Sequence, residues 1–227
     1  MNELISVVVP IHKPQKKLLD VCHSLHLAIT PIEIIYVVHD KLVDPIKITK
    51  SYEHIIRVPN KGRGYMIVDG TRLAKGDIIV FLHSDTILPK DWDVLIRQTM
   101  QNKNVIGGGF SLKFDPEHFY LTLMKKLIKI LVRMTKVLSG DRAIFIRFEQ
   151  LKKDLSFLEI PIMEDIALSF WMKKHGKVVL LKQSVITSAD AFTRNGFICQ
   201  SWKIFKCLAW YKLKGDVQNI YRYYYDK

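Results

Sequence analysis

Hydrophobic residues in the first half of the chain gather in short continuous runs, which polar or turn-forming residues separate. Such runs, rich in Ile and Val and without polar alternation, are typical of strands that are covered on both faces. They predict strands at residues 4–10, 32–38, 54–58 and 78–82. Helical spacing of apolar residues predicts helices at residues 14–29 and 65–74. This alternation predicts an α/β fold with a mostly parallel sheet and helices on both faces.

The second half of the chain alternates less regularly and ends in aromatic-rich helices. We predict strands at residues 105–114, 143–147 and 178–181, and helices at residues 91–100, 119–138, 161–175, 198–213 and 216–225. Asp91 is the predicted N-cap of the first of these helices. Gly107, Gly108 and Gly109 interrupt a strand, which usually marks a bulge or a place where a ligand approaches the backbone. No repeat or linker divides the chain, so we predict a single domain.

Three polar residues, His83, Ser84 and Asp85, follow the apolar run at residues 78–82. In open α/β sheets the ligand crevice lies just outside the carboxyl ends of the strands. A carboxylate at that place can hold Mg²⁺ or Mn²⁺ against a diphosphate, because both ions prefer oxygen ligands and keep positions open for phosphates. The alternative is a strand that simply ends in a polar turn.

Net charge is the unusual feature of the composition. The value of +13 predicts an anionic partner such as a nucleotide, a phospholipid surface or nucleic acid. The scattered Cys22, Cys199 and Cys207 argue against a disulfide framework and for a reducing compartment. The chain starts without a signal-peptide h-region, and no 18-residue window is free of charge. We therefore expect a cytoplasmic protein without a spanning helix.

A set of short motifs runs through nearly the whole chain, from residue 5 to about residue 221. The segments are 6–10 (Ser-Val-Val-Val-Pro), 36–40 with Asp44, 62–64 (Gly-Arg-Gly), 75–77, 81–86 with 88–89 and Trp92, 107–110, 140–142 (Gly-Asp-Arg), 163–165 (Met-Glu-Asp) and 185–188. In this order and spacing the chain resembles a family 2 glycosyltransferase of the GT-A fold, from the small single-domain bacterial subgroup. The resemblance implies a nucleotide-binding half at 1–100, an acceptor half at 101–190 and a C-terminal helical extension at 191–227.

The resemblance implies an enzyme that takes a sugar from a nucleotide-diphosphate donor, UDP-linked or related. Asp85 occupies the place of the metal-binding second aspartate of the family's Asp-x-Asp motif, which implies Mn²⁺ or Mg²⁺ as cofactor. His83 replaces the first aspartate, and we interpret it as a neutral hydrogen-bond donor to the nucleotide rather than as a metal ligand.

The same resemblance places the nucleotide base across the ends of the first two strands. Pro10 and His12 would wall the base, and Asp40 resembles the carboxylate that accepts a hydrogen bond from a uracil-type base. Arg63 lies in a glycine-flanked loop before a helix, where it can pair with phosphate. The alternative readings are a plain turn residue for Asp40 and a solvated surface charge for Arg63.

Asp165 is the residue that the resemblance implies as general base of an inverting transfer. Such a reaction needs a carboxylate on the acceptor side to take the proton of the attacking hydroxyl. Neighbouring Glu164 is a candidate for an acceptor contact, although both acids could merely complement the helix dipole. Asp141 and Arg142 match the segment near the donor sugar and the acceptor, and Gly108 and Gly109 are assigned to the same region.

The predicted helix at 119–138 is basic along one side and apolar along the other. Lys125, Lys126, Lys129, Arg133 and Lys136 share about a quarter-turn. Such a helix can lie in the interface of an anionic membrane. On this interpretation the protein lies at the inner face of the cell membrane and uses a lipid-linked acceptor. The alternative is a helix that packs on the sheet with its lysines in water. The aromatic C-terminal segment is a second candidate interfacial patch.

A second class of function stays open, namely a catalytically idle GT-A-like module that binds nucleotides or membrane surfaces. His39, His83 and Arg142 at motif positions favour it. A nucleotidyltransferase would need a glycine-rich loop directly after the first strand, and residues 10–14 lack the glycines. Nucleic acid would account for the charge, but no recognition motif is present, so we expect no nucleic-acid partner.

Overall fold

The computed structural model describes residues 3–43, 45–59, 62–117 and 119–225, and the side chains of 122–128 are not part of that description. Its centre is an eight-stranded sheet with the order β3-β2-β1-β4-β7-β6-β8-β5. Strands β1 (Ile5–Ile11), β2 (Ile32–His39), β3 (Glu53–Val58) and β4 (Ile78–Phe81) are parallel. These four strands confirm the prediction from the apolar runs.

The other half of the sheet is mixed. Strand β7 (Ile144–Arg147) pairs antiparallel with β4 and with β6 (Val105–Asp115), and β6 runs parallel to β8 (Lys177–Ser188). The short β5 (Thr86–Ile87) pairs antiparallel with β8. Strand β8 extends beyond the predicted 178–181, because its second half pairs with β6 from Ser111 to Asp115 and buries only alternate residues, Val185 and Thr187. Sequence reasoning also missed β5, which is too short to form a pattern.

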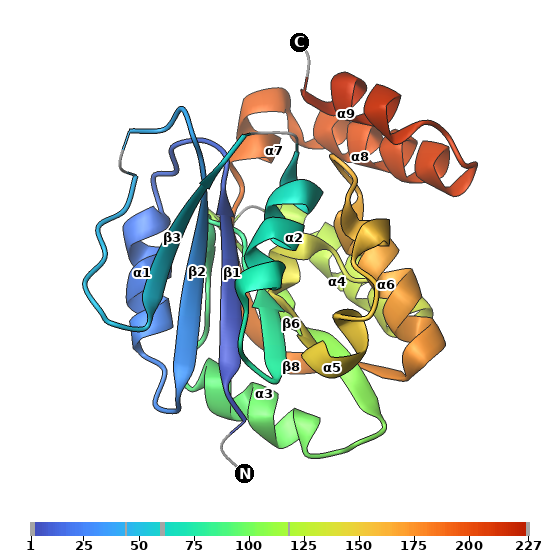
Figure 1. Ribbon diagram of the computed structural model, residues 1–227. Coiled ribbons are helices and arrows are strands. Elements are labelled where there is room, and N and C mark those ends of the chain that lie inside the picture. Colours follow the sequence, from blue (N-terminus) through green and yellow to red (C-terminus); the bar gives the residue numbers. More distant parts are fainter. Residues whose placement is uncertain (1–2, 44, 60–61, 118, 226–227) are drawn as a thin grey trace.

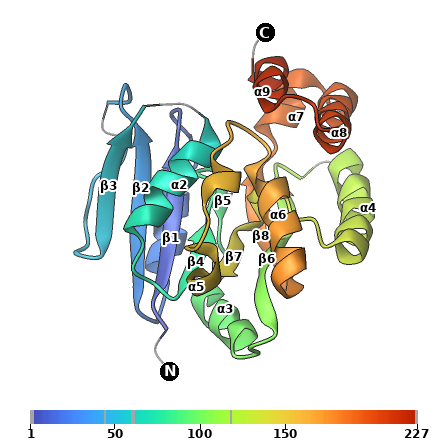
Figure 2. The same ribbon diagram turned by 45° about the vertical axis from the view of Figure 1, so that its right-hand side comes forward.

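Helices cover both faces of the sheet (Figures 1 and 2). Helices α1 (Leu18–His26) and α3 (Trp92–Met100) pack on one face, and α2 (Arg63–Leu73) and α6 (Glu164–His175) pack on the other. Successive residues of β1 therefore enter different cores: Val7 and Val9 lie with α1 and α3, while Val8 lies with α2. This two-sided burial explains why the strands appear in the sequence as unbroken apolar runs.

The remaining helices are α4 (Phe119–Thr135), the short α5 (Phe148–Leu151) and α7 (Asp190–Asn195), and the C-terminal pair α8 (Phe197–Lys212) and α9 (Val217–Tyr225). Helix α4 ends three residues before the predicted boundary at 138, and Lys136 has a positive φ of 56°. Helices α7, α8 and α9 lie at the end of the molecule to which β1 runs (Figure 1). No helix in the described part of the chain is both long enough and apolar enough to cross a bilayer.

Of two local predictions, one needs correction and one is confirmed. Asp91 makes no side-chain capping hydrogen bond to α3 and is itself left-handed, with φ 57°; only its carbonyl accepts a bond, from the Leu95 N–H. The bulge predicted at the glycines of β6 is confirmed, because the register of β6 against β8 shifts between Val105 and Gly107 and again between Gly109 and Ser111. Gly107 and Gly108 also lie close to neighbouring strands. A Cβ on Gly108 would lie 2.2 Å from the Val179 carbonyl oxygen and 2.8 Å from the Phe145 ring.

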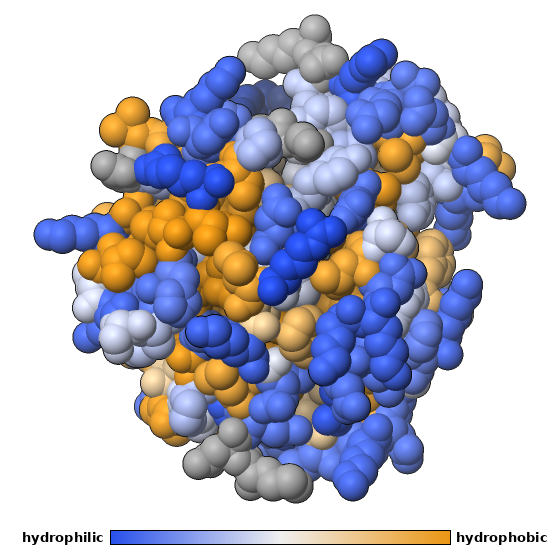
Figure 3. Space-filling model, viewed as in Figure 1, coloured by the Kyte–Doolittle hydropathy of each residue, from blue (hydrophilic) through white to orange (hydrophobic). Residues whose placement is uncertain are grey.

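The face of the molecule that Figure 3 shows has a hydrophobic and a hydrophilic region. Hydrophobic residues gather at the left of Figure 3, over β3 and the loop before it, whereas the region over α6 is hydrophilic. In that loop Val43 is 92% exposed.

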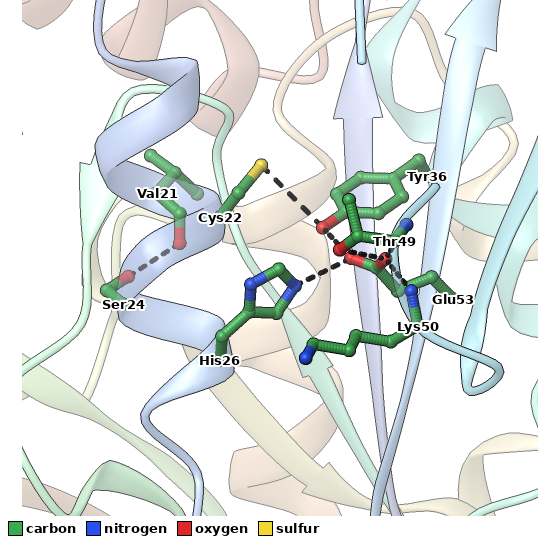
Figure 4. Close-up of polar contacts among 8 residues, drawn as sticks. All are labelled: Val21, Cys22, Ser24, His26, Tyr36, Thr49, Lys50 and Glu53. Carbon is green, nitrogen blue, oxygen red and sulfur yellow. Dashed lines mark hydrogen bonds and ion pairs between the residues drawn. The ribbon is translucent and has the colours of Figure 1, made fainter. Parts of the chain in front are cut away.

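A buried carboxylate, Glu53, ties the first helix to the edge of the sheet (Figure 4). It accepts hydrogen bonds from the Thr49 and Lys50 N–H groups (2.8 and 2.9 Å) and from the Tyr36 hydroxyl (3.1 Å), and it lies 2.8 Å from His26 Nε2. Burial alone would raise the pKa of Glu53, but these hydrogen bonds together hold it below the ordinary value.

Replacing Glu53 by Ala should therefore destabilise the fold by about 2–4 kcal/mol, because several buried donors lose their acceptor together. The measurement is urea unfolding at pH 7, with Glu149→Gln on the exposed surface as control. Because the folded pKa of Glu53 is depressed, its contribution is present above the unfolded pKa and is lost as the pH falls through the folded one. An unchanged unfolding midpoint in Glu53→Ala would contradict this account.

Candidate functional site

The polar residues that follow β1 and β4 meet at one edge of the sheet. Both strands are parallel, so their carboxyl ends lie side by side, and the Leu82 N–H still donates to the Val8 carbonyl (3.0 Å). His12 follows β1, and His83 and Asp85 follow β4. Burial, together with the charges of Lys13, Arg63 and His83 beside it, lowers the pKa of His12 to about 4. His12 is therefore neutral at pH 7.

His83 is fixed by the short 3₁₀ helix at Gly140–Arg142. Its Nδ1 lies 2.8 Å from Asp141 Oδ1. Burial alone would raise the pKa of Asp141, but the hydrogen bond and charge of His83, with Arg63 and Arg142 nearby, bring it below the ordinary value. Ring orientation at His83 is thus set by a residue almost sixty positions away in sequence.

Asp165 lies in the first turn of α6, directly beside this histidine. The N–H groups of Gly140 and Ile166 donate to its two oxygens (2.7 and 2.8 Å). A Cβ on Gly140 would lie 2.4 Å from His83 Nε2 and 3.5 Å from Asp165 Oδ2, so only a glycine fits between them. Burial, and then the charge of Glu164, raise the pKa of Asp165.

Glu164 and Arg63 join the two halves of the site. Arg63 Nε donates to Glu164 Oε1 in an ion pair, and the Arg63 N–H donates to the Pro161 carbonyl (3.2 Å). Gly62 (φ 119°) and Gly64 allow this contact, because a Cβ on either would overlap the 158–161 backbone. Glu164 is only 2% exposed, and its Oε2 has no hydrogen-bond partner among the described residues. Arg63 is therefore not the solvated surface charge of the alternative reading.

Asp85 is the part-buried carboxylate without a partner at this edge. The structure gives its side chain no hydrogen bond or ion pair to any described residue. Burial raises the pKa of Asp85; Asp141 raises it further, whereas His83, Arg63 and Lys13 act against the shift. A carboxylate in this position is a ready ligand for a cation.

Tyrosines of the C-terminal helices cover the site, a feature that sequence reasoning assigned only to a surface patch or a core. Tyr225 packs edge-on to His12, with ring centroids 6.4 Å apart. Burial raises the pKa of Tyr225 to about 12, against the opposing charge of Arg63. Burial also raises the pKa of Tyr224 and of Tyr211; the charge of Asp141 adds to the shift of Tyr224, and the charges of Asp165 and Glu164 add to that of Tyr211. The only signal in the sequence was the density of tyrosine at residues 221–225.

The other predicted residues make their contacts outside this group. Asp40 is exposed, and its nearest charged partner is His39 (3.4 Å). Gly108 lies inside the sheet. Arg142 is 2% exposed and donates to the Phe110 carbonyl (3.2 Å), and a Cβ on Gly109 would lie 3.2 Å from the Arg142 carbonyl oxygen. Pro10 is buried in β1. Asp44 and the side chains of Lys125 and Lys126 lie outside the described residues.

Comparison with known proteins places this site in context. Residues 6–155 match the family model described as "Glycosyl transferase family 2". This match covers more than half of the chain and includes His12, Arg63, Asp85 and Asp141, but not Asp165. No curated protein matches the sequence significantly.

Solved structures of TarS from S. aureus share the fold. One TarS structure superposes with a TM-score of 0.65 at 17% identity, over 82% of this chain and 36% of TarS. The TarS fragment 1–349 gives a TM-score of 0.62 at 16% identity, and its complex with UDP gives 0.61 at 15% identity. These matches cover 81% and 82% of this chain and 60% of the fragment. The chain thus spans 36% of one of these TarS chains and 60% of the other two, less than two thirds of each, and the likeness shows the GT-A fold.

Proposed function

Because the chain belongs to glycosyl transferase family 2, we propose that it transfers a sugar from a nucleotide-diphosphate sugar to an acceptor hydroxyl, with inversion at the anomeric carbon. One observation carries the proposal. His83, which with His12 and Asp85 forms the donor edge of the site, and the carboxylate of Asp165 both lie against Gly140: a Cβ there would be 2.4 Å from His83 Nε2 and 3.5 Å from Asp165 Oδ2. A sugar bound over this group would face the carboxylate of Asp165 on its acceptor side.

Asp165 acts as the general base in this proposal. The acceptor oxygen bonds to the anomeric carbon, and its proton passes to an Asp165 oxygen. The bond between the sugar and the diphosphate breaks, and its electron pair leaves with the diphosphate oxygen. A raised pKa makes Asp165 a stronger proton acceptor than an ordinary aspartate, while Gly140 N–H holds it in place. Arg63 and the N-terminus of α2 would bind the departing diphosphate.

The residues at this edge fit a divalent cation that is held mainly by substrate. The described residues contain no group of three or more His, Cys, Asp or Glu side chains arranged to hold a metal ion. Unpaired Asp85 nevertheless offers one carboxylate, and Mg²⁺ at such sites is typically bound by one or two carboxylates plus substrate phosphates and water. Mn²⁺ or Mg²⁺ bound there would neutralise charge on the leaving diphosphate. His83, whose Nδ1 is engaged by Asp141, keeps Nε2 for the nucleotide.

The proposal also includes the nucleotide base of the donor and the class of acceptor. TarS fragment 1–349 has been solved with UDP, which supports a uracil-type base between His12, Pro10 and Asp40. Gly109, Asp141, Arg142 and Glu164 are assigned to the sugar and acceptor side. A lipid-linked acceptor at the inner face of the cell membrane, approached through residues 119–138, accords with the charge of +13.

The test is calorimetric titration of UDP with and without Mn²⁺. Wild type should bind UDP more tightly with Mn²⁺, and Asp85→Asn should abolish most of that gain, about tenfold or more in affinity. Asp20→Asn, an exposed aspartate of α1, is the matched control and should bind as wild type. If the affinity for UDP changes neither with Mn²⁺ nor in Asp85→Asn, the result would instead favour the idle nucleotide-binding module.

A further inference from the structure

Helix α8 carries two apolar faces, and only one of them is covered. Cys207 is fully buried against Ile162, Met163 and Ile166, and thus fixes α8 beside the first turn of α6. On the opposite side, Ile198, Trp202 and Phe205 are 76%, 65% and 60% exposed. Their spacing of four and three residues places them in one stripe along the helix. The Trp202 and Phe205 rings stack at 5.6 Å, so the stripe is a continuous apolar ridge.

A cationic hollow lies beside this ridge. It measures about 530 Å³ and is lined by Cys199, Trp202, Lys203, Arg222 and Tyr223, without a carboxylate among them. Lys203 and Lys206 lie over the Tyr223 ring, at 5.8 and 4.5 Å from its centroid. Lys203, Lys206 and Arg222 form no ion pair with a described residue. The hollow therefore offers positive charge to an anion from outside the chain.

Helix α4 contacts α8 where both helices begin. Tyr120 at the start of α4 contacts Phe197 at the start of α8, with ring centroids 5.7 Å apart. Further along α4, Leu131 and Met134 are 58% and 79% exposed, next to the exposed Arg133. Both helices lie on the side of the molecule away from β3 (Figures 1 and 2). This side thus combines exposed apolar residues with cations over two helices.

We propose that the α8 ridge and its cationic hollow are a docking surface for an anionic phospholipid bilayer. Apolar side chains of the ridge would enter the interface, and Lys203, Lys206 and Arg222 would meet lipid phosphates. The ridge is a poorer surface for a second copy of this chain, because a two-fold contact places the same cations against one another. Helix α9 carries Arg222 and also Tyr225 of the candidate site, so docking would bring that site close to the bilayer.

Vesicle co-sedimentation of the full chain tests the proposal. Wild type should bind vesicles that contain phosphatidylglycerol, bind pure phosphatidylcholine weakly, and lose affinity at high salt. Trp202→Ser/Phe205→Ser should reduce binding by about tenfold or more. Lys203→Glu/Arg222→Glu should do the same, but only for anionic vesicles. Leu19→Ser/Ile29→Ser, which removes apolar residues that are 79% and 71% exposed elsewhere, should leave binding unchanged.

Trp202 supplies a second readout, because it is the most exposed tryptophan and Trp92 is fully buried. Its emission should move to shorter wavelength on anionic vesicles, and Trp202→Phe should remove that change. Equal binding of all variants, absence of binding to anionic vesicles, or a dimer that Trp202→Ser dissociates would each overturn the proposal. UDP titration of the same variants should match wild type, so failure here is distinct from failure of the proposed function.

Discussion

Asp165→Asn is expected to lower turnover by about 10²–10⁴-fold while donor affinity stays close to that of wild type. The amide has the size of the carboxylate, and its oxygen can still accept the Gly140 N–H bond, but it cannot take a proton. The measurement is release of nucleoside diphosphate from a panel of sugar nucleotides with Mn²⁺, with water in place of the acceptor where none is known. Titration of UDP into the same variant reports binding separately.

The pH dependence of turnover provides the matching control. Because the pKa of Asp165 is raised, its basic form is lost as the pH falls through that raised value, and turnover should fall with it. Glu164→Gln removes a neighbouring negative charge that raises this pKa, so the acid limb should move to lower pH. Glu149→Gln on the surface should leave the profile unchanged. Full turnover in Asp165→Asn would show that Asp165 is not the general base.

The donor edge of the site was predictable from sequence because it depends on strand order. Apolar runs define β1 and β4, and polar residues that directly follow parallel strands must share one edge of the sheet. The placement of His12, His83 and Asp85 follows from that rule. The apolar runs can be recognised in the sequence because both faces of the sheet are covered, so no alternating polar residues interrupt them.

What the sequence could not supply were contacts between segments far apart in the chain. The Asp141–His83 bond, the Gly140 N–H bond to Asp165 and the Arg63–Glu164 pair span 58, 25 and 101 residues. Each depends on loops whose positions are set by packing and not by any local pattern. The tyrosine cover has the same origin, since only the packing of α8 and α9 on α6 decides which aromatic residues reach the site.

Arg63→Met is expected to weaken both the fold and donor binding. Glu164 is 2% exposed, and without Arg63 its charge is buried and uncompensated, which costs about 3–5 kcal/mol. Loss of the guanidinium also removes the proposed partner of the diphosphate. Urea unfolding and calorimetric titration of UDP with Mn²⁺ measure the two effects on the same sample.

The double variant Arg63→Met/Glu164→Met separates these two roles. An apolar pair of similar volume in place of a buried ion pair is often neutral or stabilising, so stability should return to near the wild-type value. Donor binding should not return, because the Arg63 guanidinium that is proposed to face the diphosphate is still missing. Recovery of both would show that Arg63 serves only to neutralise Glu164, and diphosphate recognition would then fall to Lys13 and the N-terminus of α2. A stable Arg63→Met single variant would show instead that water already solvates Glu164, contrary to its burial under the 62–64 loop.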